Sequence, residues 1–454
     1  MRTALVVWLL VATACGGQRV TSRIPAEPSV TPFPSASATA SPASPQGMPP
    51  ISAGAAREAG VLFVAGADDW IYRYDGATGD LRRVTRHARI GLVTRDGAYA
   101  EGLEGGLVLL LWDGTTEAVD CGPGRFQRMS ASGACLSYVD QSSRPVWVRA
   151  PGETTARLIL PGDWGAGDVA LSPDARRIAL LRSTPGPTFE ARLHNALWVI
   201  DPSGTPQRLY EPKESSAFLL NLAWSPDGRW LTVWEQPVIS NSVSADGDRL
   251  LLIDATDGTV ADLGTTLLAR SWLQWTRDGR LAFVRGGDRQ TWLGKQLVVR
   301  AADGTVRVMT DDDHVGLAPA WVPGPRGQLG LAWVEAEVGN GNGGVYVAGT
   351  GPGARYGVVS DDLRSPGRRL PFPRIVEGIR PSADAGVTLV LVRRPSAPPV
   401  RDEYGALELW LMKPPGGGIS TQVPLVTGLG GLAFGYYGAQ PSLFELVAWS
   451  LDPR

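Results

Sequence analysis

The sequence predicts an all-β protein, a β-propeller of four-stranded antiparallel blades, with eight blades expected and seven as the alternative. Three observations lead to this fold class. A turn motif recurs roughly every 50 residues, and an unaccompanied strand pattern stands near the C-terminal end. The composition, with 56 glycines and 36 prolines in 454 residues, favours short strands joined by tight turns.

The repeat is clearest between residues 222 and 260. One strand ends in Trp224-Ser-Pro-Asp-Gly228, where proline fixes φ, aspartate caps the turn and glycine accepts a positive φ. A second strand and an apolar third strand follow, and Asp257-Gly258 then turns the chain into a fourth. Copies begin at Val169 and Leu273, and weaker copies occupy the rest. A single sheet cannot bury both of its faces, so the units must pack around an axis.

The turns that follow the first strand of each unit decide the number of blades. They occur at Asp96, Ser132, Asp174, Asp227, Asp278, Gly324, Asp384 and Asp452. Eight turns predict eight blades, and seven blades follow if the weak copy near Ser132 or Gly324 is not a true blade.

The two ends of the repeat array complement one another. The segment that begins at Val61 resembles the second to fourth strands of a unit, and residues 446–452 resemble a first strand with nothing after it. We therefore expect the C-terminal strand to complete the first blade and close the ring, which would leave no open sheet edge there.

These motifs resemble the TolB-type propeller family, whose mark is Trp-Ser-Pro-Asp-Gly-x-x-Leu-Ala at the first hairpin of each blade. The match is close at Trp224–Thr232, good at Leu171–Ala179 and Trp275–Phe283, and looser elsewhere between residues 60 and 454. The resemblance implies the fold and a general role as a protein-docking platform in the cell envelope. It specifies no partner, because related propellers bind, scaffold or carry enzymes.

The N-terminal region reads as an address followed by a spacer. Residues 1–14 hold Arg2 and an apolar run too short to cross a bilayer core of about 30 Å, as in a signal peptide. The run ends in Val11-Ala-Thr-Ala-Cys15, which resembles the lipobox of bacterial lipoproteins and implies a diacylated Cys15. The family prefers leucine where this chain has Ala12.

Residues 15–58 are rich in proline, serine, threonine and alanine and nearly uncharged over 28–45, which predicts a disordered tether. The propeller is expected over residues 59–454. This organisation predicts a lipid-anchored protein on the extracytoplasmic side of a membrane, periplasmic or at the cell surface, because two acyl chains suffice for stable anchoring.

Composition and motifs argue against several functions. The net charge of −2 provides no field for nucleic acid. No Gly-x-Ser-x-Gly elbow, complete Asp-box or metal-binding pattern is found, so we expect neither a catalytic residue nor a metal or other cofactor. Only three histidines are present, which limits catalysis that depends on this residue.

Polar and aromatic residues in the connections between blades are candidates for recognition. Such connections lie on one face of a propeller, around the mouth of its channel. The candidates at this rim are His87, Arg89, Asp163, Trp164, Asp311, Asp312 and His314. Exposed groups of these types on one rim predict a partner-binding surface.

The remaining cysteines, Cys121 and Cys135, form a candidate disulfide. A pair outside the cytoplasm oxidises if the two residues can meet. The predicted strands place Cys121 after one blade and Cys135 within the next, where an intervening strand separates them. Both the bonded and the free state therefore remain open.

The function predicted from the sequence is non-catalytic: a monomeric binding or scaffold module, attached to the membrane by its lipid, with a protein or a cell-envelope polymer as partner. Two alternatives remain. One is a glycosidase- or lactonase-like propeller enzyme with its site at the channel mouth, which would gather carboxylates there. The other is the sensor or accessory ectodomain of a signalling system.

Overall fold

The computed structural model describes residues 49–451 with interruptions. The gaps are residues 87–88, 103–105, 125, 131–132, 140–144, 161–165, 184–193, 202–203, 238–245, 289–292, 324–328, 339–354, 360–367, 372–374, 383–385, 394–406, 414–420 and 430–442. The predicted signal peptide, Cys15 and most of the predicted tether lie outside these residues. The propeller belongs to a compact unit that runs from Gln46 to Arg454.

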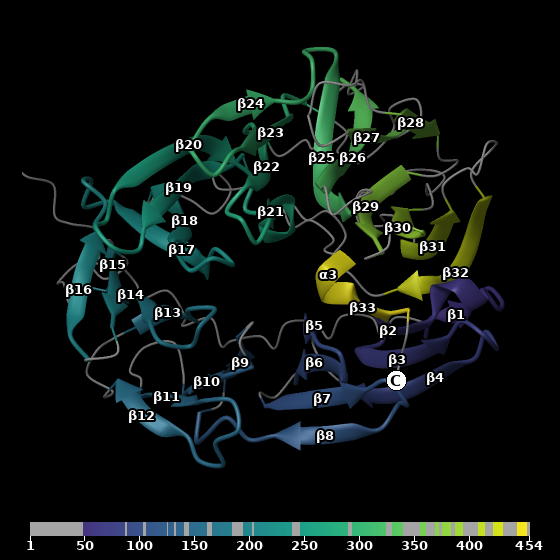
Figure 1. Cartoon of the computed structure of the whole chain (residues 1–454), viewed down its shortest axis with the longest axis horizontal. Coiled ribbons are helices and arrows are strands. Elements are labelled where there is room, and N and C mark those ends of the chain that lie inside the picture. Colours follow the sequence, from purple (N-terminus) through teal and green to yellow (C-terminus); the bar gives the residue numbers. More distant parts are fainter. Residues whose placement is uncertain are drawn as a thin grey trace, which may run out of the picture. The chain divides into compact units, whose positions relative to one another are not determined.

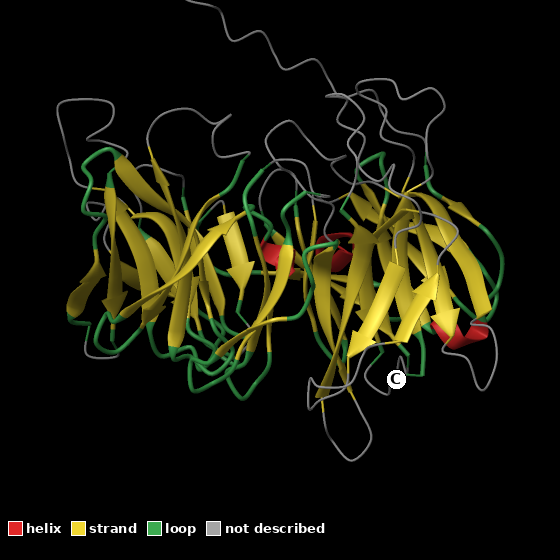
Figure 2. Ribbon diagram, turned by 90° about the horizontal axis from the view of Figure 1, so that it is seen from above, coloured by secondary structure: helices red, strands yellow, loops and turns green. Residues whose placement is uncertain are grey.

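The described strands of this unit form an all-β propeller of antiparallel blades, as predicted (Figures 1 and 2). The first strand of each sheet lies nearest the centre and the fourth lies outermost (Figure 1). The eight sheets, each written from the inside outward, are β33 (Val447–Ser450), β2 (Val61–Ala65), β3 (Trp70–Asp75) and β4 (Leu81–Arg86); β5 (Arg89–Val93), β6 (Gly97–Glu101), β7 (Leu107–Leu111) and β8 (Thr116–Val119); β9 (Phe126–Met129), β10 (Cys135–Tyr138), β11 (Val146–Arg149) and β12 (Arg157–Leu160); β13 (Ala166–Leu171), β14 (Ile178–Ser183), β15 (Asn195–Ile200) and β16 (Pro206–Tyr210); β17 (Ala217–Trp224), β18 (Trp230–Pro237), β19 (Asp248–Asp254) and β20 (Val260–Thr266); β21 (Leu273–Trp275), β22 (Leu281–Arg285), β23 (Gln296–Arg300) and β24 (Val306–Val308); β25 (His314–Pro323), β26 (Leu329–Glu337), β27 (Arg355–Val359) and β28 (Arg368–Pro371); and β29 (Ile375–Pro381), β30 (Thr388–Arg393), β31 (Leu407–Lys413) and β32 (Thr421–Leu429), beyond which lies β1 (Ile51–Ser52).

Three short helices accompany the strands: the 3-10 turns η1 (Arg57–Ala59) and η3 (Arg270–Trp272), and the α-helix α3 (Leu443–Leu446). In the part of the chain that the structure describes, no helix has both the length and the hydropathy needed to cross a membrane.

Strands from opposite ends of the chain meet in one sheet. β33 pairs antiparallel with β2, with Val447 opposite Val64 and Trp449 opposite Leu62. The Trp449 indole N–H also donates to the Ala59 carbonyl at 2.8 Å. The last described strand is therefore the inner neighbour of the first long one.

Ordered structure begins earlier than the boundary expected at residue 59. Ile51 and Ser52 pair with Thr427 and Val426 on the outer edge of β32, and the Ala53 N–H donates to the Leu425 carbonyl at 2.9 Å. An open strand edge offers unpaired backbone groups, and these residues satisfy them. The end of the segment predicted to be a tether thus belongs to the folded body.

The Ser-Pro-Asp-Gly turns work by side-chain hydrogen bonding. In the turn after β17, the Ser225 hydroxyl donates to Asp227 Oδ1 at 2.5 Å and accepts the Trp230 N–H at 2.8 Å. Gly228 has a φ of 68°. The predicted roles of aspartate and glycine are confirmed, and the buried serine proves to be the hub of the turn.

Each turn motif also fastens its blade to the preceding one. The Trp224 indole N–H donates to the Ala170 carbonyl in β13 at 3.0 Å, and the Arg177 guanidinium lies 4.8 Å from the Trp224 ring centroid. Trp321 in β25 repeats the arrangement with a 2.9 Å bond to the Gln274 carbonyl in β21. These tryptophans fill the space between blades, where an indole contributes both apolar area and one directed bond.

A disulfide joins Cys121, just after β8, to Cys135, at the start of β10, with a Cα–Cα distance of 5.4 Å. Both residues are buried against Leu107. The separation feared from the predicted strands does not arise, because Cys121 returns toward the centre of the molecule before β9 begins.

One lysine is almost completely buried. Lys295 is 1% exposed, and its ammonium donates to the carbonyls of Gly287, Asp288 and Leu293 at 2.6, 2.8 and 2.8 Å. It thereby satisfies the backbone of the connection that precedes β23. Burial lowers the pKa of Lys295 to about 8.

Candidate functional site

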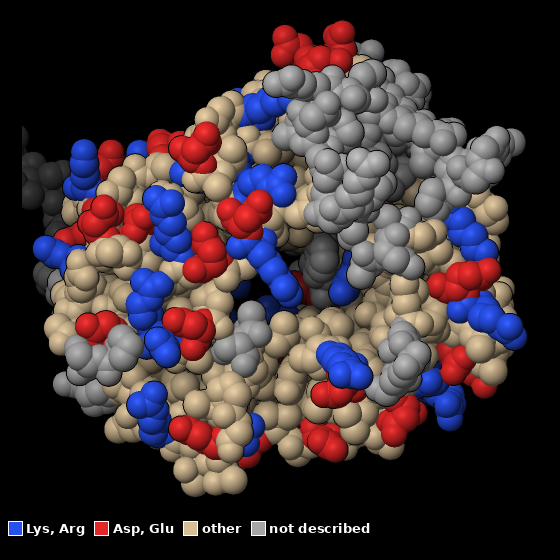
Figure 3. Space-filling view, viewed as in Figure 1, with Lys and Arg blue, Asp and Glu red and all other residues tan. Residues whose placement is uncertain are grey.

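A pocket of about 650 Å³ opens beside the propeller axis, along the inner strands of four successive sheets. Its walls come from the places where first strands begin and second strands end: Arg89 begins β5, and Glu101 ends β6. Arginine side chains surround the central hollow of the molecule in the space-filling view (Figure 3). The lining residues are Arg89, Glu101, Gly102, Gly106, Gln127, Arg128, Tyr138, Gly167, Asp168, Leu181, Ser183, Asn195, Phe218, Leu219, Leu220, Asn221 and Arg270.

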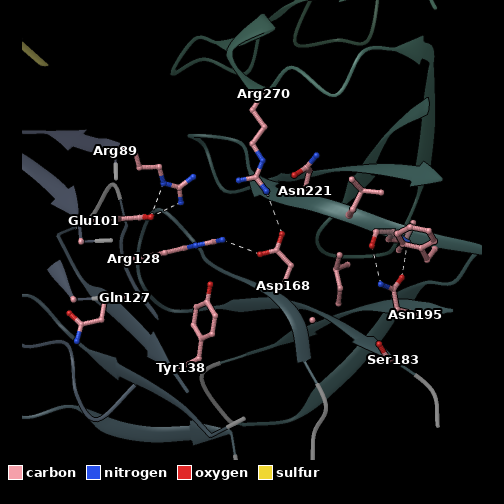
Figure 4. Close-up of a pocket in the computed structure, with 17 residues that line it drawn as sticks. Arg89, Glu101, Gln127, Arg128, Tyr138, Asp168, Ser183, Asn195, Asn221 and Arg270 are labelled. Carbon is pink, nitrogen blue, oxygen red and sulfur yellow. Dashed lines mark hydrogen bonds and ion pairs between the residues drawn. The ribbon is translucent and has the colours of Figure 1, made fainter. Parts of the chain in front are cut away.

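Asp168 is the centre of the polar wall (Figure 4). Its Oδ1 accepts from Arg128 Nη1 and from the Val169 N–H, each at 3.0 Å. Its Oδ2 accepts the Leu222 N–H at 3.0 Å and lies 3.5 Å from Arg270 Nη2. One carboxylate therefore joins groups from four parts of the chain.

Irregular strand register makes this arrangement possible. The pairing of β17 with β18 shifts between Leu220 and Ala223, and Asn221 adopts a φ of 58° within the shift. A bulge frees backbone groups from the ladder. Here it turns the Leu222 N–H toward Asp168 and places Asn221 on the pocket wall.

Arg270 enters from η3 with fewer partners than the other arginines. Its side chain is 38% exposed, and its ion-pair contact is the one at 3.5 Å with Asp168. Its Nε is buried without a hydrogen-bond partner. Burial, opposed by the attraction of Asp168, lowers the pKa of Arg270, and the neighbouring charges of Arg128 and Arg89 act in the same direction as burial.

Arg89 and Glu101 form a close pair on the opposite wall. Both Nε and Nη2 of Arg89 lie 2.7 Å from Glu101 Oε2. Burial works to lower the pKa of Arg89, but the hydrogen bond and the charge of Glu101 outweigh it and raise this pKa above its ordinary value. The carboxylate of Glu445 in α3 acts on both Arg89 and Arg270.

The remaining wall is aromatic, amide and aliphatic. Arg128 lies 5.9 Å from the Tyr138 ring centroid, and burial raises the pKa of Tyr138. The Asn195 side chain exchanges two hydrogen bonds with the Leu219 backbone, at 2.9 and 2.7 Å. That exchange ties β15 to β17 of the next blade and so holds Phe218 and Leu220 at the pocket.

The residues predicted at the rim are only partly described. Arg89 lines the pocket. His314 begins β25, and its Nδ1 lies 2.5 Å from Asp311 Oδ1; Asp312 is exposed in the same connection. His87, Asp163 and Trp164 lie outside the described residues. The rim surface remains a prediction.

Sequence reasoning did not select Arg128, Asp168 or Arg270. These residues are far apart in the chain, and none belongs to a recognisable motif. The available signal was position: Asp168 and Arg128 stand in first strands, which line the axis of a propeller. Among the described residues, no group of three or more His, Cys, Asp or Glu side chains is placed to hold a metal ion.

Comparison with known proteins relates the chain to others by fold. No family model matches the sequence, and no curated protein shows significant similarity to it. Similar solved structures include dipeptidyl peptidase 4 of Porphyromonas gingivalis, at 10% identity and a TM-score of 0.46 over 79% of this chain. The chain spans 58% of that peptidase.

Two further structures illustrate the range. The dihydro-heme d1 dehydrogenase NirN in complex with DHE shows 15% identity and a TM-score of 0.46, covering 84% of this chain and 77% of its own. TolB of Acinetobacter baumannii shows 12% identity and a TM-score of 0.30, covering 69% and 63%. Oligogalacturonate lyases also share the fold. These likenesses bear on the fold alone, because the neighbours differ in function.

Proposed function

We propose that this protein is a lipid-anchored, extracytoplasmic binding module, which docks a protein or cell-envelope polymer at the pocket end of its propeller without catalysis. The observation that carries the proposal is the commitment of the pocket's two carboxylates. Glu101 is held by Arg89 at 2.7 Å, and Asp168 is held by Arg128 and two backbone N–H groups at 3.0 Å.

A general acid or base must exchange a proton with its substrate, which requires an accessible carboxyl whose pKa lies near the working pH. Carboxylates that serve as acceptors for several donors are stabilised in the charged form. They are therefore better suited to positioning arginines than to transferring protons. Phe218 and Leu220, beside the charged groups, add apolar area of the kind found in binding sites.

Partner docking can be tested by photo-crosslinking in the intact membrane. A photoreactive amino acid replaces Phe218 in the pocket of the full chain, and a matched variant carries it at Val306, which is 48% exposed in the outer strand β24. We expect a discrete adduct from position 218 that position 306 does not form. The same adducts from both positions, or none from position 218, would refute docking at the pocket.

Anchoring is tested separately with Cys15→Ser. Loss of the thiol removes the atom that would carry the acyl chains, so we expect the variant to leave the membrane fraction while the Cys121–Cys135 disulfide still forms. Retention of Cys15→Ser in the membrane fraction, with wild-type incorporation of labelled fatty acid, would show that Cys15 is not the anchor.

A further inference from the structure

We propose that the pocket binds an oxyanion, the carboxylate or phosphate group of a small ligand, between Arg270, Arg128 and Arg89. This inference rests on the proposed binding function and specifies the chemistry that the same site recognises.

The first argument is the distribution of charge. Three arginines and two carboxylates line the pocket, and the exposed Glu445 of α3 lies nearby. Glu101 is occupied by Arg89, and both oxygens of Asp168 already accept hydrogen bonds at 3.0 Å. Arg270 therefore has no close counterion among the described residues and contacts Asp168 only at 3.5 Å.

The second argument is the chemistry of Arg270 itself. A guanidinium is a planar group with five N–H donors, and it matches the paired oxygens of a carboxylate or phosphate. Arg270 has a buried Nε with no partner, yet its side chain is 38% exposed. A cation that is partly withdrawn from water and weakly paired gains from an incoming anion.

The third argument is geometric. In Figure 4 the guanidinium groups of Arg89, Arg128 and Arg270 point toward a common space, with the Tyr138 hydroxyl directed toward Arg128 from below. Arg270 senses the charges of both other arginines, which agrees with their closeness. A cavity of about 650 Å³ has the size of a small-ligand site, and Phe218 and Asn221 would contact the rest of the molecule.

The test is titration of the full chain in detergent with citrate and, separately, with inorganic phosphate, each against sodium chloride of equal ionic strength. Calorimetry measures binding. We expect saturable binding of at least one oxyanion to the wild type, with the stronger one identifying the group as carboxylate or phosphate. Absence of saturable binding of both would overturn the proposal.

Charge variants supply the decisive comparison. Arg270→Gln should weaken binding roughly tenfold, since a charge-assisted pair is lost. Arg270→Lys keeps the charge without the planar donor set and should be intermediate. Glu101→Gln releases Arg89 and should tighten binding. The control Arg307→Gln removes an exposed arginine of β24 and should bind as the wild type does.

Opposite effects of Arg270→Gln and Glu101→Gln cannot come from misfolding, which would weaken binding in both. Unchanged affinity in Arg270→Gln, or weaker affinity in Glu101→Gln, overturns the oxyanion site. The result is independent of partner docking: a position-218 adduct without anion binding would refute this inference and leave the proposed function standing.

Discussion

Ala175 occupies a turn position that the equivalent turn after β17 gives to a glycine. Its φ is 58°, close to the 68° of Gly228, and both residues donate their N–H to the serine carbonyl three positions earlier at 2.9 Å. A residue with a Cβ is strained in this region of backbone space. The fold of the first blades thus retains a small local cost.

Replacement Ala175→Gly should raise the free energy of unfolding by about 0.5–1 kcal/mol, because relief of the strain exceeds the added flexibility of the unfolded chain. Urea denaturation measures the change. The control Ala302→Gly lies in a turn without a positive φ at that residue and should bring no gain. Equal effects of the two substitutions would contradict the explanation.

Lys295 predicts a pH dependence. Its pKa is lowered by burial from 10.5 to about 8, so between these values the unfolded chain binds more protons than the folded one. Stability contributed by this group therefore rises as the pH rises through that window. Compared with Lys295→Met, the wild type should gain on the order of 3 kcal/mol between pH 7 and 10.5.

The measurement is urea denaturation of both proteins at several pH values. The difference between them isolates Lys295 from tyrosines that titrate in the same range. At pH 7 the methionine variant also leaves three carbonyls without their donor, which costs stability. A difference that stays constant with pH would show that Lys295 is not destabilised by burial.

At the scale of the element, the turn motif both ends a strand and joins neighbouring blades. Trp224→Phe and Trp321→Phe each remove one indole hydrogen bond to the preceding blade, and each should cost about 1 kcal/mol. The two residues stand in sheets separated by a third, so the double variant should show the sum. Strong non-additivity in urea denaturation would mean that the blades are coupled otherwise.

The predictability of the elements differs from that of the pocket. Strands and turns could be predicted because their causes are local: the Ser225, Asp227 and Gly228 side chains and backbone act within a few residues. The pocket depends on a register shift after Leu220 and on ion pairs between residues as distant as Asp168 and Arg270. No local pattern announces either. Arg89 was found because it stands in a connection between blades.

For the whole molecule, the pairing of β33 with β2 leads to a prediction about cooperativity. Trp449 is 8% exposed and donates to Ala59, and its truncation to alanine should cost about 3–5 kcal/mol. If the pairing closes the ring, the propeller should still unfold in one transition at a lower temperature.

Calorimetry checks this, with Leu451→Ala, a 39% exposed residue just past the strand, as the control. A separate early transition for the sheet of β2–β4 would show that this blade is not part of a closed cooperative unit. No difference between the Trp449 and Leu451 variants would show that β33 contributes little.

The burial of Lys295 has a practical consequence for labelling chemistry. The chain holds only three lysines, Lys213, Lys295 and Lys413, and Lys295 is inaccessible to reagents in solution. Lysine-directed dyes, beads or bifunctional linkers should therefore attach at two side chains, Lys213 before β17 and Lys413 at the end of β31. Neither lines the pocket, so the protein can be immobilised through its amines with the arginine-lined opening left unmodified.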